Sequence, residues 1–133
     1  MYLLDTNIIL ELLLDQEKAD EVERFLRNTP PASLHLSEFA LYSLGVVLFR
    51  HKMHDTFLQS VKDLLVTGGI RLVRLVVEDM QDIAHAARRF NLDFDDAYQY
   101  TAAEKYGLTI VSFDADFDRT EQGRKTPGEI LGG

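Results

Sequence analysis

Apolar residues along this chain occur alternately in short continuous runs and at helical spacing, and this pattern predicts a series of strands and helices. The chain opens on an apolar run that ends at Asp5, which is typical of a buried strand. Segments 6–15 and 17–28 carry apolar residues three or four positions apart, so both are predicted helices. A proline pair stops the second helix, and the alternating stretch SLHLS at 33–37 predicts the second strand.

The same alternation continues toward the C-terminus. Two further strands are predicted, one at 70–77 and one in the β-branched run 108–113, which is the clearest of all. The remaining apolar residues at helical spacing predict four more helices, at 38–52, 54–69, 78–91 and 94–107. The tail from Asp114 is polar and rich in turn residues, and a last short strand is expected near Glu129 to Leu131.

This order of elements predicts the architecture of the protein. Strands that alternate with helices form a parallel sheet covered on both faces, so we expect an α/β fold, a three-layer α/β/α sandwich with a central, mainly parallel sheet. A length of 133 residues suits one ordinary domain with its own core. No linker or internal repeat interrupts the pattern, and we assign residues 1–133 to a single domain.

Composition excludes several classes of protein. The hydrophobic content is 46%, and no apolar run reaches the roughly 18 residues that a membrane-spanning helix needs. The chain has no cysteine, which rules out disulfides, thiolate nucleophiles and cysteine-ligated zinc. Because the sequence begins directly with a strand-like segment, we expect no signal peptide and predict a cytoplasmic protein without membrane contact.

Five acidic residues stand at the joints between predicted strands and helices. Asp5 ends the first strand, Glu38 and Asp96 lie in the first turns of helices, and Asp114 and Asp116 follow the last clear strand. In α/β folds such positions meet at the carboxyl edge of the sheet. Carboxylates that converge repel one another unless a hard cation neutralises them. The pattern therefore predicts a site for Mg²⁺ or Mn²⁺.

Each of these acids also has an ordinary structural explanation. Asp5 or Thr6 could simply cap the helix that follows, and Glu38 could complement the dipole of a helix capped by Ser37. Of the adjacent acids Asp95 and Asp96, one could cap the helix while the other points into a cleft. The acids after the last strand could form an Asx-turn. Only their joint placement at four strand–helix junctions favours a metal site.

Four segments of the chain together resemble one known family. MYLLDTNIIL, SEF, FDDAYQYTAA and IVSFDADF occur in the order and spacing of the PIN-domain ribonucleases, and they look most like the small single-domain VapC-type toxins. The resemblance covers essentially the whole chain. It implies a PIN-like nuclease domain with four catalytic acids: Asp5, Glu38, Asp96 and Asp114. It also implies that the metal is held by Asp5, Asp96, Asp114 and the more variable Asp116.

The resemblance further implies supporting residues, a reaction and partners. Thr6 and Asn7 complete the family's DTN signature, and Ser112 stands where the family carries a supporting hydroxyl. The expected activity is a divalent-metal-dependent endoribonuclease, with one or two Mg²⁺ or Mn²⁺ ions promoting attack of water on the phosphodiester. The expected role is the toxin of a type II toxin–antitoxin pair, with RNA as substrate, a small antitoxin as a possible partner and a homodimer as the expected assembly.

Two other classes of function stay open on the sequence. A metal-dependent phosphatase or phosphotransferase would use an aspartate nucleophile, but Asn7 stands where the haloacid-dehalogenase phosphatases carry a second aspartate. A non-enzymatic interaction module could share the fold, although a pure binder has no need of converging acids. The formal net charge of −8 weakens nucleic-acid binding in general, and bound cations would offset part of it. The leucine-rich run from Leu10 to Leu14 could serve the core or an interface with a partner.

Overall fold

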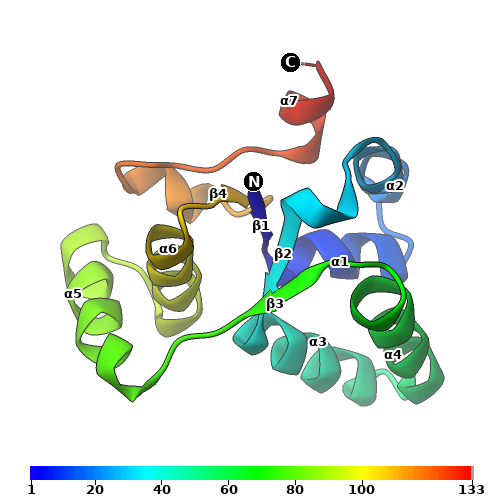
Figure 1. Ribbon diagram of the computed structural model, residues 1–133, viewed down its shortest axis with the longest axis horizontal. Helices are drawn as coiled ribbons and strands as arrows, with labels where there is room; N and C mark the ends of the chain where they lie inside the picture. Colours follow the sequence, from blue (N-terminus) through cyan, green and yellow to red (C-terminus); the bar gives the residue numbers. More distant parts are fainter. Residues whose placement is uncertain (133) are drawn as a thin grey trace.

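Four parallel strands form the central sheet, in the order β3-β2-β1-β4. The computed structural model describes residues 1–132 (Figure 1). The strands are β1 (Tyr2–Leu4), β2 (Leu34–Ser37), β3 (Arg71–Val73) and β4 (Thr109–Val111). Tyr2 of β1 lies opposite Leu34 on one side and Thr109 on the other, so the strands end at the same edge of the sheet. The predicted parallel sheet is confirmed.

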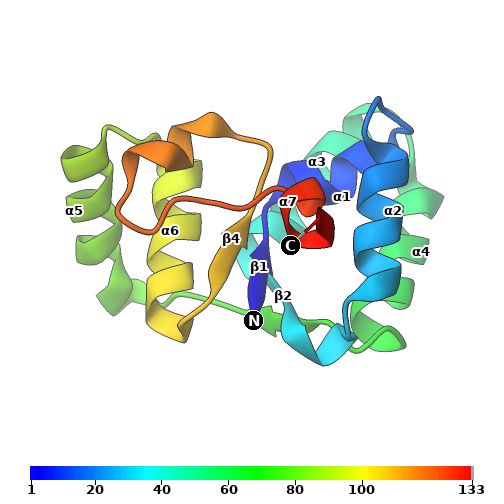
Figure 2. The ribbon, with the colours of Figure 1, turned by 90° about the horizontal axis from the view of Figure 1, so that it is seen from above.

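Helices cover both faces of this sheet (Figure 2). They are α1 (Thr6–Leu13), α2 (Ala19–Asn28), α3 (Glu38–Arg50), α4 (His54–Val61), α5 (Met80–Phe90), α6 (Phe94–Tyr106) and α7 (Pro127–Gly132). Side chains alternate along β1, so Leu3 packs in the core under α5 and α6, whereas Leu4 packs in the core under α1, α2 and α3. The predicted three-layer α/β/α sandwich is confirmed, and no helix within residues 1–132 is long and apolar enough to cross a membrane.

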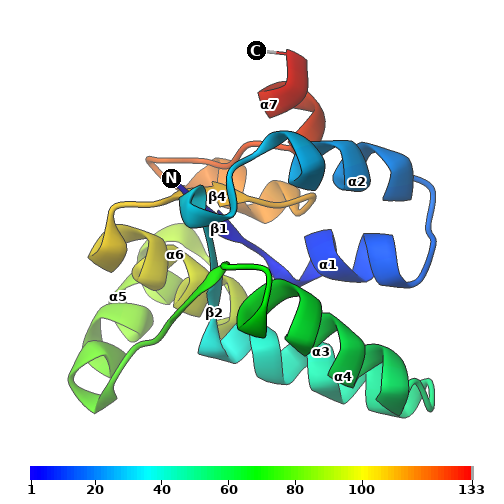
Figure 3. The same ribbon diagram turned by 45° about the vertical axis from the view of Figure 1, so that its right-hand side comes forward.

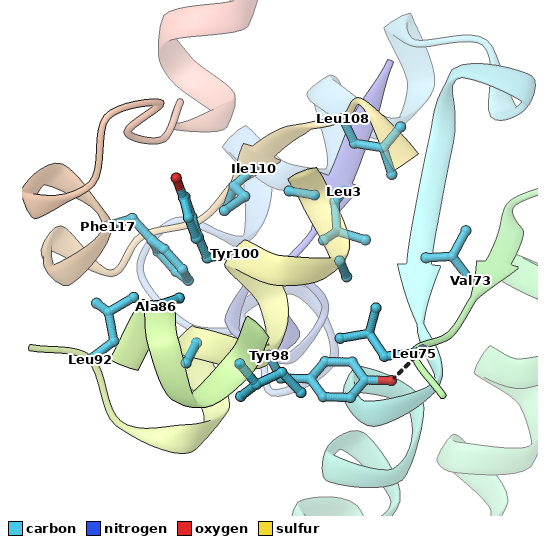
Figure 4. Close-up of a cluster of buried hydrophobic side chains, with 14 residues drawn as sticks. Leu3, Val73, Leu75, Ala86, Leu92, Tyr98, Tyr100, Leu108, Ile110 and Phe117 are labelled. Carbon is cyan, nitrogen blue, oxygen red and sulfur yellow. Dashed lines mark hydrogen bonds between the residues drawn. The ribbon is translucent and has the colours of Figure 1, made fainter. Parts of the chain in front are cut away.

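Helix α6 is the most deeply buried helix of the α5–α6 layer. Its buried residues lie on all sides of the helix, and the small side chains of Ala97, Ala102 and Ala103 allow close approach to the sheet. Figure 4 shows Tyr98 of this helix reaching the chain beyond β3, where the backbone N–H of Leu75 donates a 3.0 Å hydrogen bond to the tyrosine hydroxyl. The helix ends at Gly107, whose φ of +67° is a left-handed conformation that suits glycine.

The third strand is shorter than the predicted 70–77. Pairing with β2 stops at Ser37, which lies opposite Val73, because the chain of β2 turns into α3 at the next residue. Beyond this point the N–H of Leu75 bonds to the Tyr98 hydroxyl instead of a strand, and Val77–Asp79 forms a 3₁₀ turn. The loss of the neighbouring strand therefore ends β3.

The strand expected near Glu129 to Leu131 is wrong, because this segment forms α7. Pro127 occupies the start of the helix, where its missing N–H costs nothing. Thr126 and Glu129 form a reciprocal capping box, in which each backbone N–H donates to the other's side chain. A single parallel bridge does form on the free side of β4, between Val111 and Lys125. Figure 3 shows α7 lying beside α2, where the N–H of Gly128 donates to Glu21.

The hydrogen bond between Tyr98 and Leu75 gives a test of this packing. Tyr98→Phe removes the acceptor and leaves the buried N–H of Leu75 without its partner, so we expect the free energy of unfolding to fall by about 1–3 kcal/mol. Urea denaturation would measure the change. Tyr42→Phe, at an exposed tyrosine of α3, is the matched control and should change stability by less than about 0.5 kcal/mol. Equal effects of the two substitutions would contradict the assignment.

Candidate active site

Three aspartates gather at the carboxyl edge of the sheet. Asp96 comes from the first turn of α6, and Asp114 and Asp116 come from the loop that follows β4. One carboxylate oxygen from each lies within 4.8 Å of the others, and Asp96 is only 6% exposed. Adjacent strands β1 and β4 end here, as the sheet order requires. The expected convergence of acids from different elements therefore holds for these three residues.

Asp5 lies directly behind this cluster, immediately after β1. Its Oδ1 accepts hydrogen bonds from the N–H of Thr6 (2.9 Å) and the side-chain amide of Gln99 (3.2 Å), and its Oδ2 accepts from the Ser112 hydroxyl (2.7 Å). Burial raises the pKa of Asp5, the three donors oppose this rise, and the charge of Asp114 adds to it. Asp5 therefore has two roles: it caps α1, and it belongs to the candidate site.

Asn7 and Ser112 tie the end of β1 to the loop after β4. The Asn7 amide donates to the Ser112 hydroxyl at 3.2 Å and accepts from the N–H of Phe113 at 3.3 Å. The same hydroxyl accepts the N–H of Asp114 at 2.9 Å. Ser112 is fully buried, so these bonds are shielded from competing water. The two residues expected to support the site therefore fix the loop that carries Asp114.

The acids around α6 divide their roles between capping and the site. Asp93 is the N-cap, and its side chain accepts the N–H of Asp96 at 3.1 Å. Because Asp93 satisfies the helix end, the Asp96 side chain is free to face Asp114. Burial, the charges of Asp114, Asp93 and Asp5, and a hydrogen bond with Asp114 raise the pKa of Asp96 to about 8. Asp95, between them, is exposed.

Asp114 and Asp116 are held by the turn between them. The Asp114 side chain accepts the N–H of Asp116 at 2.8 Å, which is an Asx-turn at the start of the 3₁₀ helix Ala115–Arg119. Arg119 lies 3.5 Å from Asp116 and offsets part of its charge. Asp116 is the more variable of the acids that the resemblance implies as metal ligands, and its carboxylate lies in the group with Asp96 and Asp114.

Glu38 lies apart from the other acids. It is the first residue of α3, directly after the Ser37 N-cap, and it faces a hollow lined by Leu72, Arg74 and Tyr106 beside β3. The residues of α3 that face the acid cluster's side are Phe39 and, one turn on, Ser43. The expected convergence of Glu38 with the remaining acids is therefore not what the structure shows, because the first turn of α3 points it toward β3.

A hollow of about 260 Å³ opens beside the acids. Its walls come from three helices, with Thr6 and Leu10 on α1, Ser43 and Val47 on α3, and Asp96 on α6. The leucine-rich run that contains Leu10 is half-buried and packs against the core, so the core explanation holds for most of it. A larger hollow of about 450 Å³ lies between α5 and α6, and the ion pair of Lys105 and Asp79 lines it. Asp96, Asp114 and Asp116 do not line this hollow.

The sequence pattern did not single out Gln99, although it contacts Asp5. This residue is 1% exposed and lies one helical turn after Asp96 on α6. Its surroundings in the sequence, AYQYTAA, are otherwise apolar or small, and a lone amide on a buried helix is a signal that could have identified it.

The donor set fits a hard divalent cation. Carboxylate oxygens are the ligands that Mg²⁺ prefers, and two or three from separate elements leave room for the waters it keeps. Burial and the charges of Asp114, Asp93 and Asp5 raise the pKa of Asp96, and a bound cation would oppose this rise. The residues that could hold the ion are Asp96, Asp114 and Asp116, with Asp5 next to them.

A parallel α/β sheet with acidic side chains gathered at its carboxyl edge defines a class of domain built around a cation site. The family model of the PIN domain matches residues 2–123. The chain therefore belongs to the PIN domain family, and the match includes every acid of the candidate site: Asp5, Asp96, Asp114 and Asp116.

Solved structures with the same fold support this assignment. A toxin–antitoxin complex from Klebsiella pneumoniae aligns with a TM-score of 0.76 at 18% identity, covering 96% of this chain and 98% of that chain. VapC20 of Mycobacterium tuberculosis, described as a sarcin–ricin loop cleaving toxin, gives 0.76 at 18% identity and covers 89% and 93%. FitAcB from Neisseria gonorrhoeae gives 0.74 at 23% identity and covers 96% and 99%. A search of curated protein sequences found no significant match.

The raised pKa of Asp96 predicts how stability depends on pH without metal. Between the ordinary value of 3.8 and about 8, the folded protein keeps a proton on Asp96 that the unfolded chain has released. The free energy of unfolding therefore falls as pH rises through this range. Asp96→Asn removes the titration, so in metal-free buffer at pH 8.5 we expect this variant to be more stable than the unmodified protein by roughly 1–3 kcal/mol.

Urea denaturation at pH 5.5 and 8.5 in the presence of a chelator measures this effect. Asp55→Asn, which removes one exposed acid from α4, changes the net charge equally and should keep the pH dependence of the unmodified protein. Adding Mn²⁺ should stabilise the unmodified protein and leave Asp96→Asn nearly unchanged. A pH dependence in Asp96→Asn as steep as that of the unmodified protein would contradict the assignment of the raised pKa.

Proposed function

We propose that this PIN-domain protein is a divalent-metal-dependent endoribonuclease. The observation that carries the proposal is the group of three aspartates within 4.8 Å at the carboxyl edge of the sheet, backed by the buried Asp5. Such a group is costly without a cation, and capping alone does not require it, because Asp93 already caps α6. Mg²⁺ is the proposed ion, with Mn²⁺ as its substitute.

Each residue has a proposed role in hydrolysis. Asp96, Asp114 and Asp116 hold the cation, and Asp5 completes the acidic set from behind. When bound, the cation supplies the Lewis acidity that polarises a phosphodiester and activates water. Ser112 and Asn7 fix the loop that carries Asp114, and Thr6 offers its side chain at the rim of the hollow.

The basic residue Arg50, beyond the hollow on α3, supports a nucleic-acid strand as the substrate. The hollow is bounded along α3 by Ser43 and Val47, and Arg50 lies seven residues after Ser43, on the same helical face. Arg50 is exposed, about 10 Å along the helix axis from Ser43, a distance that can serve a neighbouring phosphate. Its charge offsets the acidic character of the chain where the strand would pass. The similarity to VapC20, described as a sarcin–ricin loop cleaving toxin, favours RNA over DNA.

The proposed biological role is the toxin of a type II toxin–antitoxin pair that acts in the cytoplasm. The similarity to the Klebsiella pneumoniae toxin–antitoxin complex over nearly the full length of both chains supports this role. Helix α3 also carries apolar side chains on its solvent face: Tyr42, Val46 and Phe49 are all at least half exposed. An apolar row on an exposed face favours contact with a second protein chain, either an antitoxin segment or another copy of this protein.

Two alternatives make different predictions. A phosphatase would need a free aspartate nucleophile, but both oxygens of Asp5 accept hydrogen bonds from neighbouring groups. A non-enzymatic interaction module would gain nothing from the mutual repulsion of Asp96 and Asp114. Hydrolysis of p-nitrophenyl phosphate without RNA cleavage would favour the phosphatase, and cation binding without any hydrolysis would favour the module.

The purified protein should cleave RNA in Mg²⁺ or Mn²⁺ and stop when a chelator is added. Asp96→Asn and Asp114→Asn remove groups proposed to hold the ion, so each should lower the cleavage rate at least about 100-fold. Asp5→Asn should also slow cleavage strongly, because it removes the charge of Asp5 and replaces one of its two accepting oxygens by an NH₂ group that can only donate. Denaturing gel analysis of end-labelled RNA measures the rates.

Asp55→Asn is the matched control for these acids. It neutralises an exposed acid of α4 that lies outside the cluster, so cleavage should stay within about threefold of the unmodified rate. Circular dichroism would verify that every variant is folded. Cleavage by Asp96→Asn at the unmodified rate would refute the proposed site.

The apolar row on α3 predicts self-association. Val46 is 51% exposed at the middle of this row, and Val46→Glu would place a charge in any interface built on it. We expect the unmodified protein to form dimers, and Val46→Glu to weaken the dimer at least about tenfold in sedimentation equilibrium. Val77→Glu, at an exposed valine in the opposite layer, should leave the dimer intact. A monomeric unmodified protein would contradict the homodimer and leave the row to an antitoxin.

A further inference from the structure

Gln99 links two strands of the sheet through its buried side chain. The Ser37 hydroxyl at the end of β2 donates to Gln99 Oε1 at 2.8 Å, and Gln99 Nε2 donates to Asp5 Oδ1 at 3.2 Å. Gln99 is 1% exposed and Ser37 is fully buried. The side chain therefore forms a bridge from β2 to the acid that follows β1.

The direction of these bonds follows from both partners, because the Asp5 carboxylate only accepts and the Ser37 hydroxyl has a proton to donate. The Ser37 hydroxyl accepts the N–H of Ala40 at 3.0 Å as the N-cap of α3, and its own proton is given to Gln99 Oε1. With Oε1 committed to Ser37, the amide NH₂ group must face Asp5. Rotation of the amide by 180° would place two oxygens against each other at Asp5, which is unfavourable in a buried site. The α3 cap thus orients the donor that holds Asp5.

Gln99 also sets the spacing between two acids. It follows Asp96 by three residues, so both side chains leave α6 on neighbouring positions of one face. A bond from Gln99 to Asp5 therefore holds this part of α6 against the end of β1. A purely structural glutamine would be satisfied by any pair of partners, but here one partner is an acid of the candidate site.

We propose that Gln99 is a positioning residue that holds Asp5 in place and fixes its separation from Asp96, and thereby sets the affinity of the site for a divalent cation. This inference rests on the proposed function, because it assigns Asp5 and Asp96 to a shared cation site. Gln99 lines the hollow but is only 1% exposed, and its amide is already bonded to Ser37 and Asp5. Partners that orient a metal's ligands change its affinity by about 10–100-fold when they are removed.

The test compares Gln99→Met with Tyr98→Phe. Methionine keeps the size and apolar stem of glutamine but cannot bond to Ser37 or Asp5. Tyr98→Phe removes a buried hydrogen bond from the adjacent position of α6, and that bond points to Leu75 and not to the site. The two variants therefore separate a loss of stability from a loss of positioning.

The measured quantity is the dissociation constant for Mn²⁺, followed by the electron paramagnetic resonance of free Mn²⁺ at neutral pH, with thermal unfolding of the same samples. Gln99→Met should bind Mn²⁺ at least about tenfold more weakly than the unmodified protein, and Tyr98→Phe within about twofold of it. If Gln99→Met fails to fold, Gln99→Asn carries the same expectation, because its shorter amide cannot reach Ser37 and Asp5 together.

Each outcome decides the inference. Unchanged Mn²⁺ affinity in a folded Gln99 variant overturns it, as does equal weakening in Tyr98→Phe, which would reduce the effect to stability. An unmodified protein that binds no Mn²⁺ overturns it together with the proposed function. RNA cleavage on the same samples separates the two proposals: weakened Mn²⁺ binding in Gln99→Met without any cleavage by the unmodified protein supports the positioning role and refutes the ribonuclease.

Discussion

The burial of the Asp5 carboxylate at the centre of the sheet edge is the constraint on which the site depends. A carboxylate out of contact with water is strongly destabilising unless donors surround it. Here the donors come from the backbone of α1, from Ser112 after β4 and from Gln99, which is itself held by Ser37 after β2. Three parallel strands are thus joined by side chains at the edge where their backbone pairing ends.

Satisfying Asp5 leaves the repulsion among the remaining acids unrelieved. Asp114 contributes to the raised pKa of both Asp5 and Asp96. Within residues 1–132, no basic side chain forms an ion pair with Asp96. The fold tolerates this because other groups perform the ordinary structural tasks of acids, with Asp93 capping α6 and Ser37 capping α3. Charge repulsion is therefore concentrated in one place, where a divalent ion would relieve it.

Much of this arrangement could be predicted from the sequence, and the errors have identifiable causes. Strong periodic signals located the strands of β1 and β4 and hence the acids after them, because strand ends in a parallel sheet share one edge. The direction in which a first-turn side chain points depends on how its helix packs, which the sequence pattern does not show. For this reason the position of Glu38 relative to the other acids could not be predicted correctly. The short strand expected near Glu129 is wrong because Thr126 and Glu129 form a capping box, which begins a helix there.

Gln99 escaped notice for a different reason. Its significance depends on two partners 62 and 94 residues away in the chain, Ser37 and Asp5, and no local pattern encodes such a pairing. Local patterns identify residues that must be acidic or apolar for their own element. A lone amide on a buried helix can indicate such a residue, but the elements that its side chain connects become visible only in three dimensions.

Helix α6 explains how the site can keep its geometry against its own repulsion. Two adjacent side chains of α6 bond to different parts of the sheet edge: Tyr98 to the chain beyond β3, and Gln99 to the end of β2 and to Asp5 after β1. Successive residues on a helix point about 100° apart, so these bonds run in different directions. Because these bonds resist movement of α6 in different directions, repulsion between Asp96 and Asp114 cannot be relieved by shifting the helix. Relief must come from protonation or from a cation.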